Sequence, residues 1–269
     1  MDKNSKKKAH VVACCIQKGG CGKTQTSVNL AVGLAKQGKK VLLIDTDPQS
    51  SATVSLGWQR SDLLEETLAG ALKKIIDHEG FSKEYGILHH AEGIDVMPCN
   101  LRLAKLELNL IYVVHREYIF KKYVDMYRED YDYIIVDCPP SLGMWAVNIY
   151  TAVDSVVIPV EMSYLALSGL ELLLETLSEV KEDLNPELKI DGILMTFYMA
   201  RTINTQQVSE ALIQGYGNNI KIFDARISEG TKARETAITG QSIYKYSPRC
   251  KISKEYERFT KEVLELWER

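Results

Sequence analysis

Seven short runs of apolar and β-branched residues constrain the fold more than any other feature of this sequence. They span Val11–Ile16, Val41–Ile44, Ile94–Met97, Tyr133–Val136, Ser155–Val160, Ile190–Thr196 and Ile220–Phe223. Runs that are apolar on both faces are typical of strands in a parallel sheet that helices cover on both sides. Segments with helical spacing lie between them, over Thr24–Gln37, Asp62–Ile76, Leu101–Tyr127, Leu165–Lys181, Thr205–Tyr216 and Ser253–Trp267. The alternation predicts an α/β fold with a predominantly parallel, twisted sheet, helices on both faces and right-handed crossovers.

The length and charge of the chain limit its class. Its 269 residues fit one large α/β domain, and it contains no internal repeat or Pro/Gly-rich linker. We therefore expect a basic N-terminal tail over residues 1–9 and a single domain over residues 10–269. The formal charge of −3 argues against a wholly basic nucleic-acid binder. No apolar run reaches the roughly 18 residues of a membrane span.

The cysteine pattern indicates a reducing compartment. Six cysteines are present and none form a C-x-x-C pair, while the five histidines lack metal-ligand spacing. Neither a disulfide framework nor a zinc site is supported, so we expect a cytoplasmic protein with buried thiols.

A glycine-rich segment follows the first apolar run and opens the first helical segment. It reads Lys18-Gly19-Gly20-Cys21-Gly22-Lys23-Thr24-Gln25. Such glycines let backbone N–H groups turn towards phosphate oxygens, and the helix N-terminus adds partial positive charge. In a phosphate-binding loop of this kind Lys23 reaches the β- and γ-phosphates and the Thr24 hydroxyl ligates Mg²⁺. The loop departs from the standard pattern at Gln17, where glycine is usual, and it carries a second lysine, Lys18.

Two carboxylate motifs follow other apolar runs. Asp45-Thr46-Asp47-Pro48-Gln49 ends one predicted strand, and Asp137-Cys138-Pro139-Pro140 ends another. Ligands of open α/β sheets bind beyond the carboxyl ends of the strands, so both motifs are expected to approach the loop. We interpret Asp137 as a Walker-B-type carboxylate that holds Mg²⁺ through a bound water.

These motifs resemble those of the deviant-Walker ATPases of the ParA/MinD family, which have the P-loop NTPase fold, and most closely the short Soj-type ParA partition proteins. The resemblance runs from about Val11 to Val263. Besides the loop and the two carboxylate motifs, it rests on the segments 155–160 and 164–170.

The resemblance implies an ATPase with ATP and Mg²⁺ as cofactors, which forms a nucleotide-sandwich homodimer. Lys18 would cross the interface and reach the phosphates of the partner subunit, in the manner of an arginine finger. Asp47 would orient the attacking water, with slow turnover until a ParB-like partner completes the site. The implied task is the segregation or positioning of chromosome, plasmid or mobile-element DNA.

Two positions depart from the family pattern beside the nucleotide. Gln25 replaces a threonine that contacts the α-phosphate, so only its backbone N–H is left to donate there. The loop Ser228-Glu229-Gly230 differs from the Pro-Arg-Asn-like loop that usually lies beside the adenine. The adenine contacts of this chain therefore cannot be transferred from the family.

A basic region near the C-terminus indicates DNA binding. Residues 226–254 carry seven Lys or Arg against two Asp or Glu. A solvated basic face explains this charge equally well on its own, but the resemblance favours contact with DNA. The candidate contacts are Arg201, Lys232, Arg234 and Arg249. We expect non-specific, phosphate-directed binding to double-stranded DNA by the ATP dimer and a nucleoid-associated location.

Three alternatives share the loop. A MinD-like membrane ATPase ends in a basic amphipathic helix, whereas residues 254–269 hold four basic and five acidic residues, so no stable membrane association is expected. An iron–sulfur electron-transfer ATPase needs two cysteines facing a dimer axis, for which Cys99 and Cys138 are the candidates. A tyrosine kinase would cluster tyrosines at its C-terminus, and the 14 tyrosines of this chain do not cluster there.

Overall fold

The computed structural model describes residues 8–268. Its strands are β1 His10–Cys14, β2 Val41–Asp45, β3 Leu88–His89, β4 Asp95–Met97, β5 Tyr133–Asp137, β6 Ser155–Glu161, β7 Lys189–Tyr198 and β8 Ile222–Ser228. Its α-helices are α1 Lys23–Lys36, α2 Ser51–Ser55, α3 Leu68–Ile76, α4 Arg102–Leu110, α5 Ile119–Asp125, α6 Met144–Ala152, α7 Tyr164–Asp183, α8 Ile203–Tyr216, α9 Thr231–Thr239, α10 Ile243–Tyr246 and α11 Lys251–Trp267. Two 3-10 turns, η1 Ser61–Leu63 and η2 Arg116–Tyr118, complete the order.

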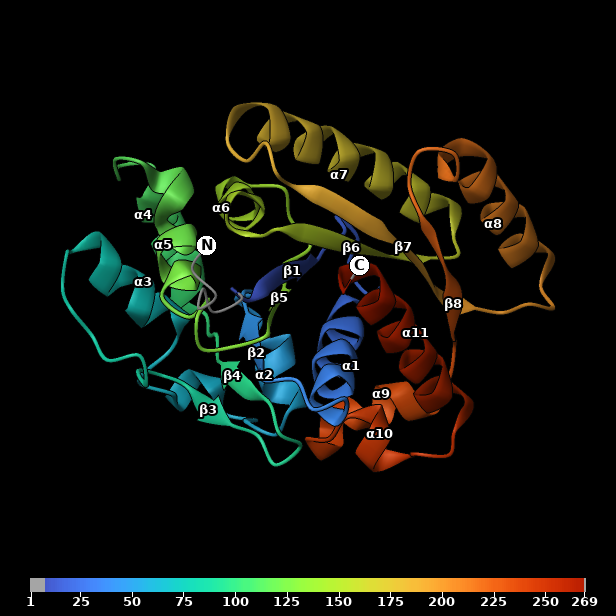
Figure 1. Cartoon of the computed structure of the whole chain (residues 1–269), viewed down its shortest axis with the longest axis horizontal. Coiled ribbons are helices and arrows are strands. Elements are labelled where there is room, and N and C mark those ends of the chain that lie inside the picture. Colours follow the sequence, from blue (N-terminus) through green and yellow to red (C-terminus); the bar gives the residue numbers. More distant parts are fainter. Residues whose placement is uncertain (1–7, 269) are drawn as a thin grey trace, which may run out of the picture.

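The strands form one eight-stranded sheet in the order β3-β4-β2-β5-β1-β6-β7-β8 (Figure 1). Every neighbouring pair is parallel except β3 with β4, which is antiparallel. The pairing of β1 with β5 aligns Cys14 with Asp137, and that of β2 with β5 aligns Asp45 with Asp137. The predicted α/β fold with a predominantly parallel sheet is thus confirmed.

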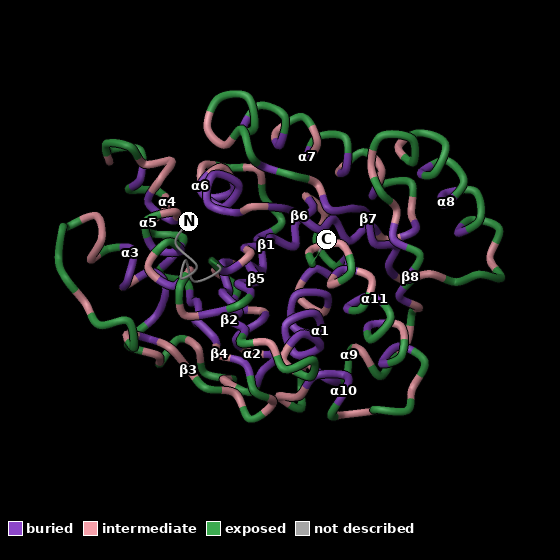
Figure 2. Tube along the Cα trace, viewed as in Figure 1, coloured by how far each residue is buried: buried purple, intermediate pink, exposed green. Residues whose placement is uncertain are grey.

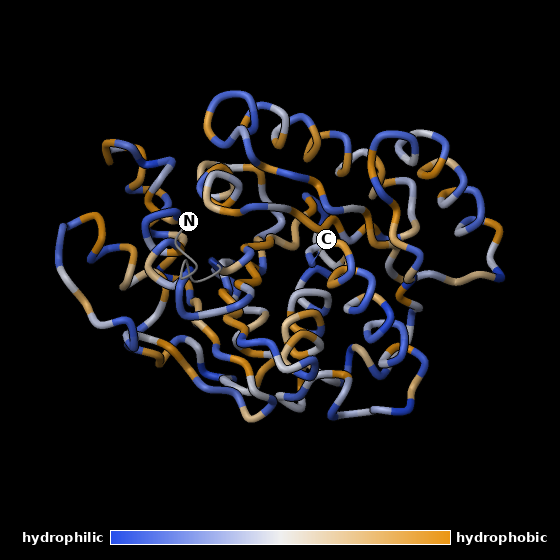
Figure 3. Tube along the Cα trace, viewed as in Figure 1, coloured by the Kyte–Doolittle hydropathy of each residue, from blue (hydrophilic) through white to orange (hydrophobic). Residues whose placement is uncertain are grey.

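Helices cover both faces of the sheet and bury two cores. Alternate residues of a strand face opposite sides, so Val11 and Ala13 of β1 join one core while Val12 and Cys14 join the other. The first core packs under α3, α5, α6 and α7, and the second under α1 and α11. Figure 2 shows the central strands as the most continuously buried part of the trace, and Figure 3 shows the same strands as largely hydrophobic.

Two predicted helices are interrupted. The segment Leu101–Tyr127 forms α4, η2 and α5: α4 ends at Leu110, and His115 then adopts a left-handed conformation with φ 55° directly before η2. In Asp62–Ile76 the helix begins only at Leu68, because Leu64 is extended, with ψ 120°. The apolar spacing predicts which face of each segment is buried, but it does not predict where the backbone leaves the helical conformation.

The N-terminal part enters the core earlier than the predicted tail suggests. Residues 1–7 of the predicted tail 1–9 lie outside the described residues. Lys8 is exposed, whereas Ala9 is buried, and its N–H donates to the Arg128 carbonyl at 2.7 Å. Among the described helices, none combines the length and apolar character that a membrane crossing requires.

Trp145 ties the first core to the carboxyl end of β2. Its ring is fully buried, packs edge-on against Phe120 at a centroid distance of 5.3 Å, and donates from Nε1 to the Thr46 carbonyl at 3.0 Å. The residue therefore links α6 with the segment that follows β2.

Replacing this ring tests the packing. Trp145→Ala should lower the free energy of unfolding by about 3–5 kcal/mol, because it leaves a large cavity. Tyr112→Ala is the matched control, since Tyr112 is 84% exposed, and its effect should stay within about 0.5 kcal/mol. Urea unfolding of both variants measures the difference, and equal effects would contradict the packing described.

Candidate nucleotide-binding site

The glycine-rich loop joins β1 to α1 at the carboxyl edge of the sheet. Gly20 and Gly22 have φ of 75° and 86°, a left-handed conformation that glycine adopts without strain. A Cβ at Gly22 would also lie 3.6 Å from the Phe197 ring. The Thr196 hydroxyl at the end of β7 donates to the Cys21 carbonyl at 2.8 Å. The end of β7 therefore holds the loop in its curved conformation.

Both loop lysines are held within the chain. Lys23 is buried, and its Nζ donates to the Lys18 carbonyl at 2.8 Å, across the turn of the loop. The Lys18 side chain leaves the loop in the other direction, and its Nζ contacts Glu161 Oε2 at 2.5 Å and Ser163 Oγ at 2.9 Å. The loop therefore presents two ammonium groups with different surroundings.

Hydroxyl groups of α1 surround the Asp137 carboxylate. Thr24 Oγ1 donates to Oδ2 at 2.8 Å, and Ser27 Oγ donates to Oδ1 at 2.7 Å. The Thr46 hydroxyl donates to the Asp137 backbone carbonyl at 2.6 Å. Oxygen groups of this kind are the ligands that Mg²⁺ prefers, so Thr24 and Asp137 fit a magnesium site.

The two aspartates at the carboxyl end of β2, Asp45 within the strand and Asp47 beyond it, have different environments. Asp45 is fully buried, and its Oδ2 accepts from the Thr53 backbone N–H and hydroxyl at 2.8 and 2.7 Å. Asp47 is half-buried, and its Oδ1 accepts from the Gln49 backbone N–H at 2.9 Å. The geometry gives Asp45 a structural role and leaves Asp47 facing the space beside the loop.

Burial has the largest effect on the pKa values of Asp45 and Asp137. Removal from water raises the pKa of Asp137 to about 6, although the bonds from Ser27 and Thr24 and the charge of Lys23 oppose the rise. Burial and the neighbouring Asp137 charge raise the pKa of Asp45 to about 7. Two carboxylates this close therefore favour a nearby cation.

An open hollow of about 380 Å³ lies against the loop. It is lined by Gly19, Gly20, Gly22, Lys23, Thr24, Gln25, Asp47, Gln49, Ser51, Ser55, Pro140, Phe197 and Ala237. The structure thus brings most of the predicted phosphate-loop residues, together with Asp47, to one concave surface. Cys21 is buried beneath the loop, and its Sγ contacts the Lys18 carbonyl at 3.1 Å.

A smaller, mostly apolar hollow of about 90 Å³ adjoins Gln25 and the start of α9. Phe197, Ile227 and Tyr256 line it together with Ser228 and Gly230 of the variant loop. The Gln25 side chain is drawn to this side, where its Nε2 donates to Thr236 Oγ1 at 3.1 Å. Its mostly apolar lining suits contact with an aromatic ring.

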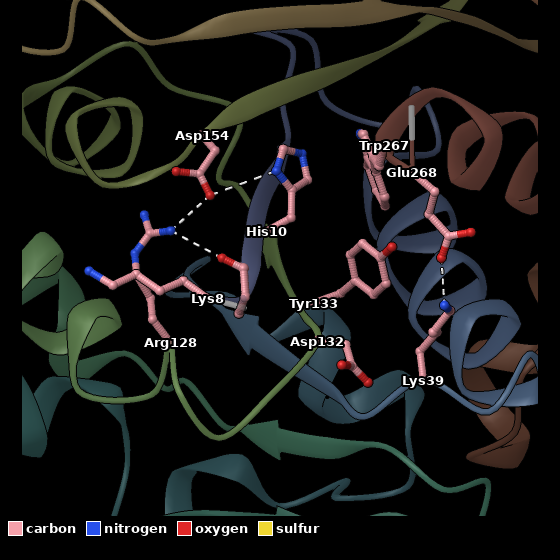
Figure 4. Close-up of a pocket in the computed structure, with 10 residues that line it drawn as sticks. Lys8, His10, Lys39, Arg128, Asp132, Tyr133, Asp154, Trp267 and Glu268 are labelled. Carbon is pink, nitrogen blue, oxygen red and sulfur yellow. Dashed lines mark hydrogen bonds and ion pairs between the residues drawn. The ribbon is translucent and has the colours of Figure 1, made fainter. Parts of the chain in front are cut away.

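Another hollow, of about 460 Å³, lies at the opposite edge of the sheet (Figure 4). Figure 4 shows Arg128 pointing towards Asp154, and its Nη1 donates to that carboxylate and to the Ala9 carbonyl at 2.8 and 3.1 Å. On the other wall Lys39 contacts Glu268 at 2.5 Å. These groups pair with one another, and the glycine-rich loop lies at the far end of β1, so we assign nucleotide chemistry to the loop.

The four predicted DNA contacts are exposed and come from separate segments. Arg201 lies between β7 and α8, Lys232 and Arg234 in α9, and Arg249 between α10 and α11. Figure 1 shows these helices on the β8 side of the molecule. Arg234 also contacts Glu229 at 2.8 Å, which partly neutralises it.

Sequence reasoning missed three residues of this site. Ser27, Glu161 and Ser163 contact Asp137 or Lys18, as described above. Ser27 lies one helical turn after Lys23 and bonds its carbonyl at 3.1 Å, so helical spacing from the loop lysine could have identified it. No local signal links Glu161 to Lys18, which is 143 positions away.

Comparisons with known proteins place the chain among its relatives. A family model described as an AAA domain matches residues 9–190. The sporulation initiation inhibitor protein Soj of Bacillus subtilis is 40% identical over 253 residues, which cover 94% of this chain and 97% of that protein. The chromosome partitioning protein ParA of Caulobacter vibrioides is 33% identical over 259 residues, 94% of this chain and 93% of that protein.

A solved structure is similar along the same length. The cobyrinic acid a,c-diamide synthase of Mycobacterium smegmatis with bound ADP and magnesium has a TM-score of 0.82 and 30% identity, covering 97% of this chain and 96% of that one. This chain and that protein are therefore similar in sequence as well as in fold.

Ser27 provides a test of the carboxylate network. Ser27→Ala removes one donor from a fully buried carboxylate, so the free energy of unfolding should fall by about 1–3 kcal/mol. Ser178→Ala on the exposed side of α7 is the control and should change stability little. Urea unfolding at neutral pH compares them, and a neutral Ser27→Ala variant would remove the serine from the network.

Proposed function

Since this chain belongs to the ParA/Soj family of partitioning ATPases, we propose that it is a Mg²⁺-dependent ATPase that binds DNA as an ATP-bound sandwich dimer. Its task would be to segregate or position chromosome, plasmid or mobile-element DNA with a ParB-like partner, in the cytoplasm and on the nucleoid. The observation that carries the proposal is the concave surface where Lys23, Thr24 and Asp47 face one hollow, with Asp137 behind Thr24.

The phosphate side of the site supports ATP binding. Gly19, Gly20 and Gly22 bring backbone to the hollow, and the N-terminus of α1 adds partial positive charge. Lys23 now donates to a carbonyl within the loop, an acceptor that a phosphate oxygen can replace. The ADP in the related Mycobacterium smegmatis structure supports a nucleotide here.

The donor set supports a magnesium ion. Thr24 lines the hollow, and its Oγ1 lies 2.8 Å from Oδ2 of the buried Asp137 behind it. We propose that Thr24 ligates the ion directly and Asp137 through a water. Bound Mg²⁺ would neutralise charge on the phosphate oxygens. Asp47, on the same surface, would orient the attacking water. A carboxylate is a weak base, which accords with slow turnover before a partner protein completes the site.

The loop edge supports pairing of two protomers. Lys18 lies at the outer side of the loop and is about one quarter exposed. Tyr164 and Leu165, which follow Ser163, are 58% and 78% exposed. An ammonium group beside exposed apolar side chains suits a contact with a second copy, in which Lys18 meets the partner's phosphates.

The exposed arginines and lysines on the β8 side support phosphate-directed DNA binding. Arg201, Lys232 and Arg249 are exposed, and within residues 8–268 none of the three forms an ion pair. Arg234 would contribute less, because Glu229 already contacts it. No base-specific recognition is proposed, since phosphate contacts carry no sequence information.

The structure bears on two of the alternatives. α11 buries Tyr256, Phe259 and Val263 in the second core, so its apolar face is covered by this chain rather than free for lipid. Cys99 and Cys138 are 0% and 2% exposed, which disfavours an iron–sulfur cluster shared at a dimer axis. The partition function is therefore the one that we propose.

Lys18→Ala tests the sandwich dimer. Monomers should still bind ATP, because Lys23 and the loop backbone remain, but ATP-dependent dimers should weaken by about 10²-fold or more, as expected for loss of a charge-assisted contact in each of two sites. Fluorescent-nucleotide binding and sedimentation velocity with a non-hydrolysable ATP analogue measure the two steps. Dimers of unchanged stability would exclude the role of Lys18 in trans.

Charge reversal tests the DNA surface. Lys232→Glu and Arg201→Glu should each weaken binding of the ATP dimer to duplexes of unrelated sequence to a similar extent, and reduce the slope of log affinity against log salt by about 1 to 2. Lys181→Glu on α7, distant in sequence from the basic region, is the control. Unchanged DNA affinity at matched salt would move the DNA surface elsewhere.

A further inference from the structure

The contact between Lys18 and Glu161 has a consequence for how two protomers meet. Lys18 Nζ lies 2.5 Å from Glu161 Oε2, and the two side chains are 26% and 31% exposed. An ion pair of this kind satisfies the ammonium group within one protomer. The lysine cannot hold this carboxylate and reach another protomer's phosphates at the same time.

We propose that Glu161 is a positioning residue that retains Lys18 in its own protomer and thereby sets the protein concentration at which ATP-bound dimers form. This inference rests on the proposed function, because it requires that Lys18 acts in trans. Dimer formation then exchanges one intramolecular ion pair in each protomer for a contact with the partner's nucleotide.

The position of Glu161 explains why it can control the loop. It is the last residue of β6 and pairs with Thr196 of β7 in the sheet register. Thr196 in turn donates to the Cys21 carbonyl at 2.8 Å. Thr196 therefore holds the loop through the Cys21 carbonyl, and its neighbour on the adjacent strand, Glu161, holds it through the Lys18 side chain.

Ser163 provides a second contact that retains Lys18. It is the N-cap of α7, where a serine normally accepts from a backbone N–H of the first turn. Its side chain accepts no bond from the helix and instead accepts from Lys18 Nζ at 2.9 Å. The hydroxyl therefore acts together with Glu161 in holding the lysine within its own protomer.

The same helix lies beneath the loop. A Cβ at Gly169 of α7 would lie 3.9 Å from both the Lys18 backbone nitrogen and Gln17 Cβ, so the backbone of α7 is close to the loop. The exposed Tyr164 and Leu165 occupy the turn between this contact and Ser163. Release of Lys18 therefore takes place at the edge where the second protomer is proposed to dock.

Glu161→Gln tests this assignment, because it removes the charge and keeps the shape. At saturating Mg²⁺ and non-hydrolysable ATP analogue, the variant should dimerise with a dissociation constant about tenfold lower than the wild-type protein, since a partly exposed ion pair contributes about threefold and each of two protomers releases one. Sedimentation velocity over a concentration series measures the constant. Glu175→Gln is the matched control, because Glu175 is an exposed glutamate on α7, and it should behave as wild type.

Further variants separate this role from a structural one. Glu161→Asp keeps the charge and should restore a dissociation constant nearer to wild type than that of Glu161→Gln, a recovery that general loosening of β6 would not produce. If Glu161→Gln does not fold, as judged by thermal unfolding, Ser163→Ala provides the same comparison through the second contact of Lys18 and should also lower the dissociation constant.

The outcomes distinguish the two proposals. Wild-type protein that binds the analogue but stays monomeric would overturn the sandwich dimer itself. Wild-type dimers together with an equal or weaker dimer of Glu161→Gln would overturn the role of Glu161 alone, because they would show that its carboxylate is neutral or stabilising in the dimer.

Discussion

The alignment of three parallel strands determines the site. β5 lies between β1 and β2, and its last residue, Asp137, is paired with Cys14 on one side and Asp45 on the other. A shift of one residue in either pairing would turn Asp137 to the opposite face of the sheet. The loop after β1 and the aspartates after β2 meet the same carboxylate only because this register is kept, and the two apolar cores on either side keep it.

This arrangement also explains why the site is charged although it is surrounded by apolar residues. Burial raises the pKa of both Asp45 and Asp137. The hydroxyls of Thr24, Ser27 and Thr53 offset part of the loss of water, together with backbone N–H groups at Asp45 and the charge of Lys23 near Asp137. Such a pair is stabilised in its ionised form by a cation. The free protein thus carries an electrostatic cost that magnesium and the loop lysine are suited to reduce.

The sequence predicted most of the sheet because its strands are apolar on both faces. The parallel sheet, the loop between β1 and α1 and the positions of Asp47 and Asp137 at strand ends all follow from short local patterns. The breaks at Leu64 and His115 did not, since a backbone reversal leaves the apolar spacing intact. The helices α2, α6, α9 and α10 were also missed. α2 and α10 are only five and four residues long, and α9 buries only Thr236. α6 is buried on nearly all sides, so it lacks the polar face that makes a helical pattern visible. The contact of Glu161 with Lys18 depends on tertiary structure alone, as neither residue has a local pattern that indicates the other.

Trp145 gives the molecule an internal optical reporter. Its indole is bonded to the Thr46 carbonyl, between the two aspartates that follow β2, and its ring is shielded from water. The emission of this ring is sensitive to displacement of the segment it holds, whereas Trp58 and Trp267 lie elsewhere on the second core. With Trp58 and Trp267 replaced by phenylalanine, the emission of this natural side chain would therefore report displacement of the Thr46 segment in solution without an attached dye.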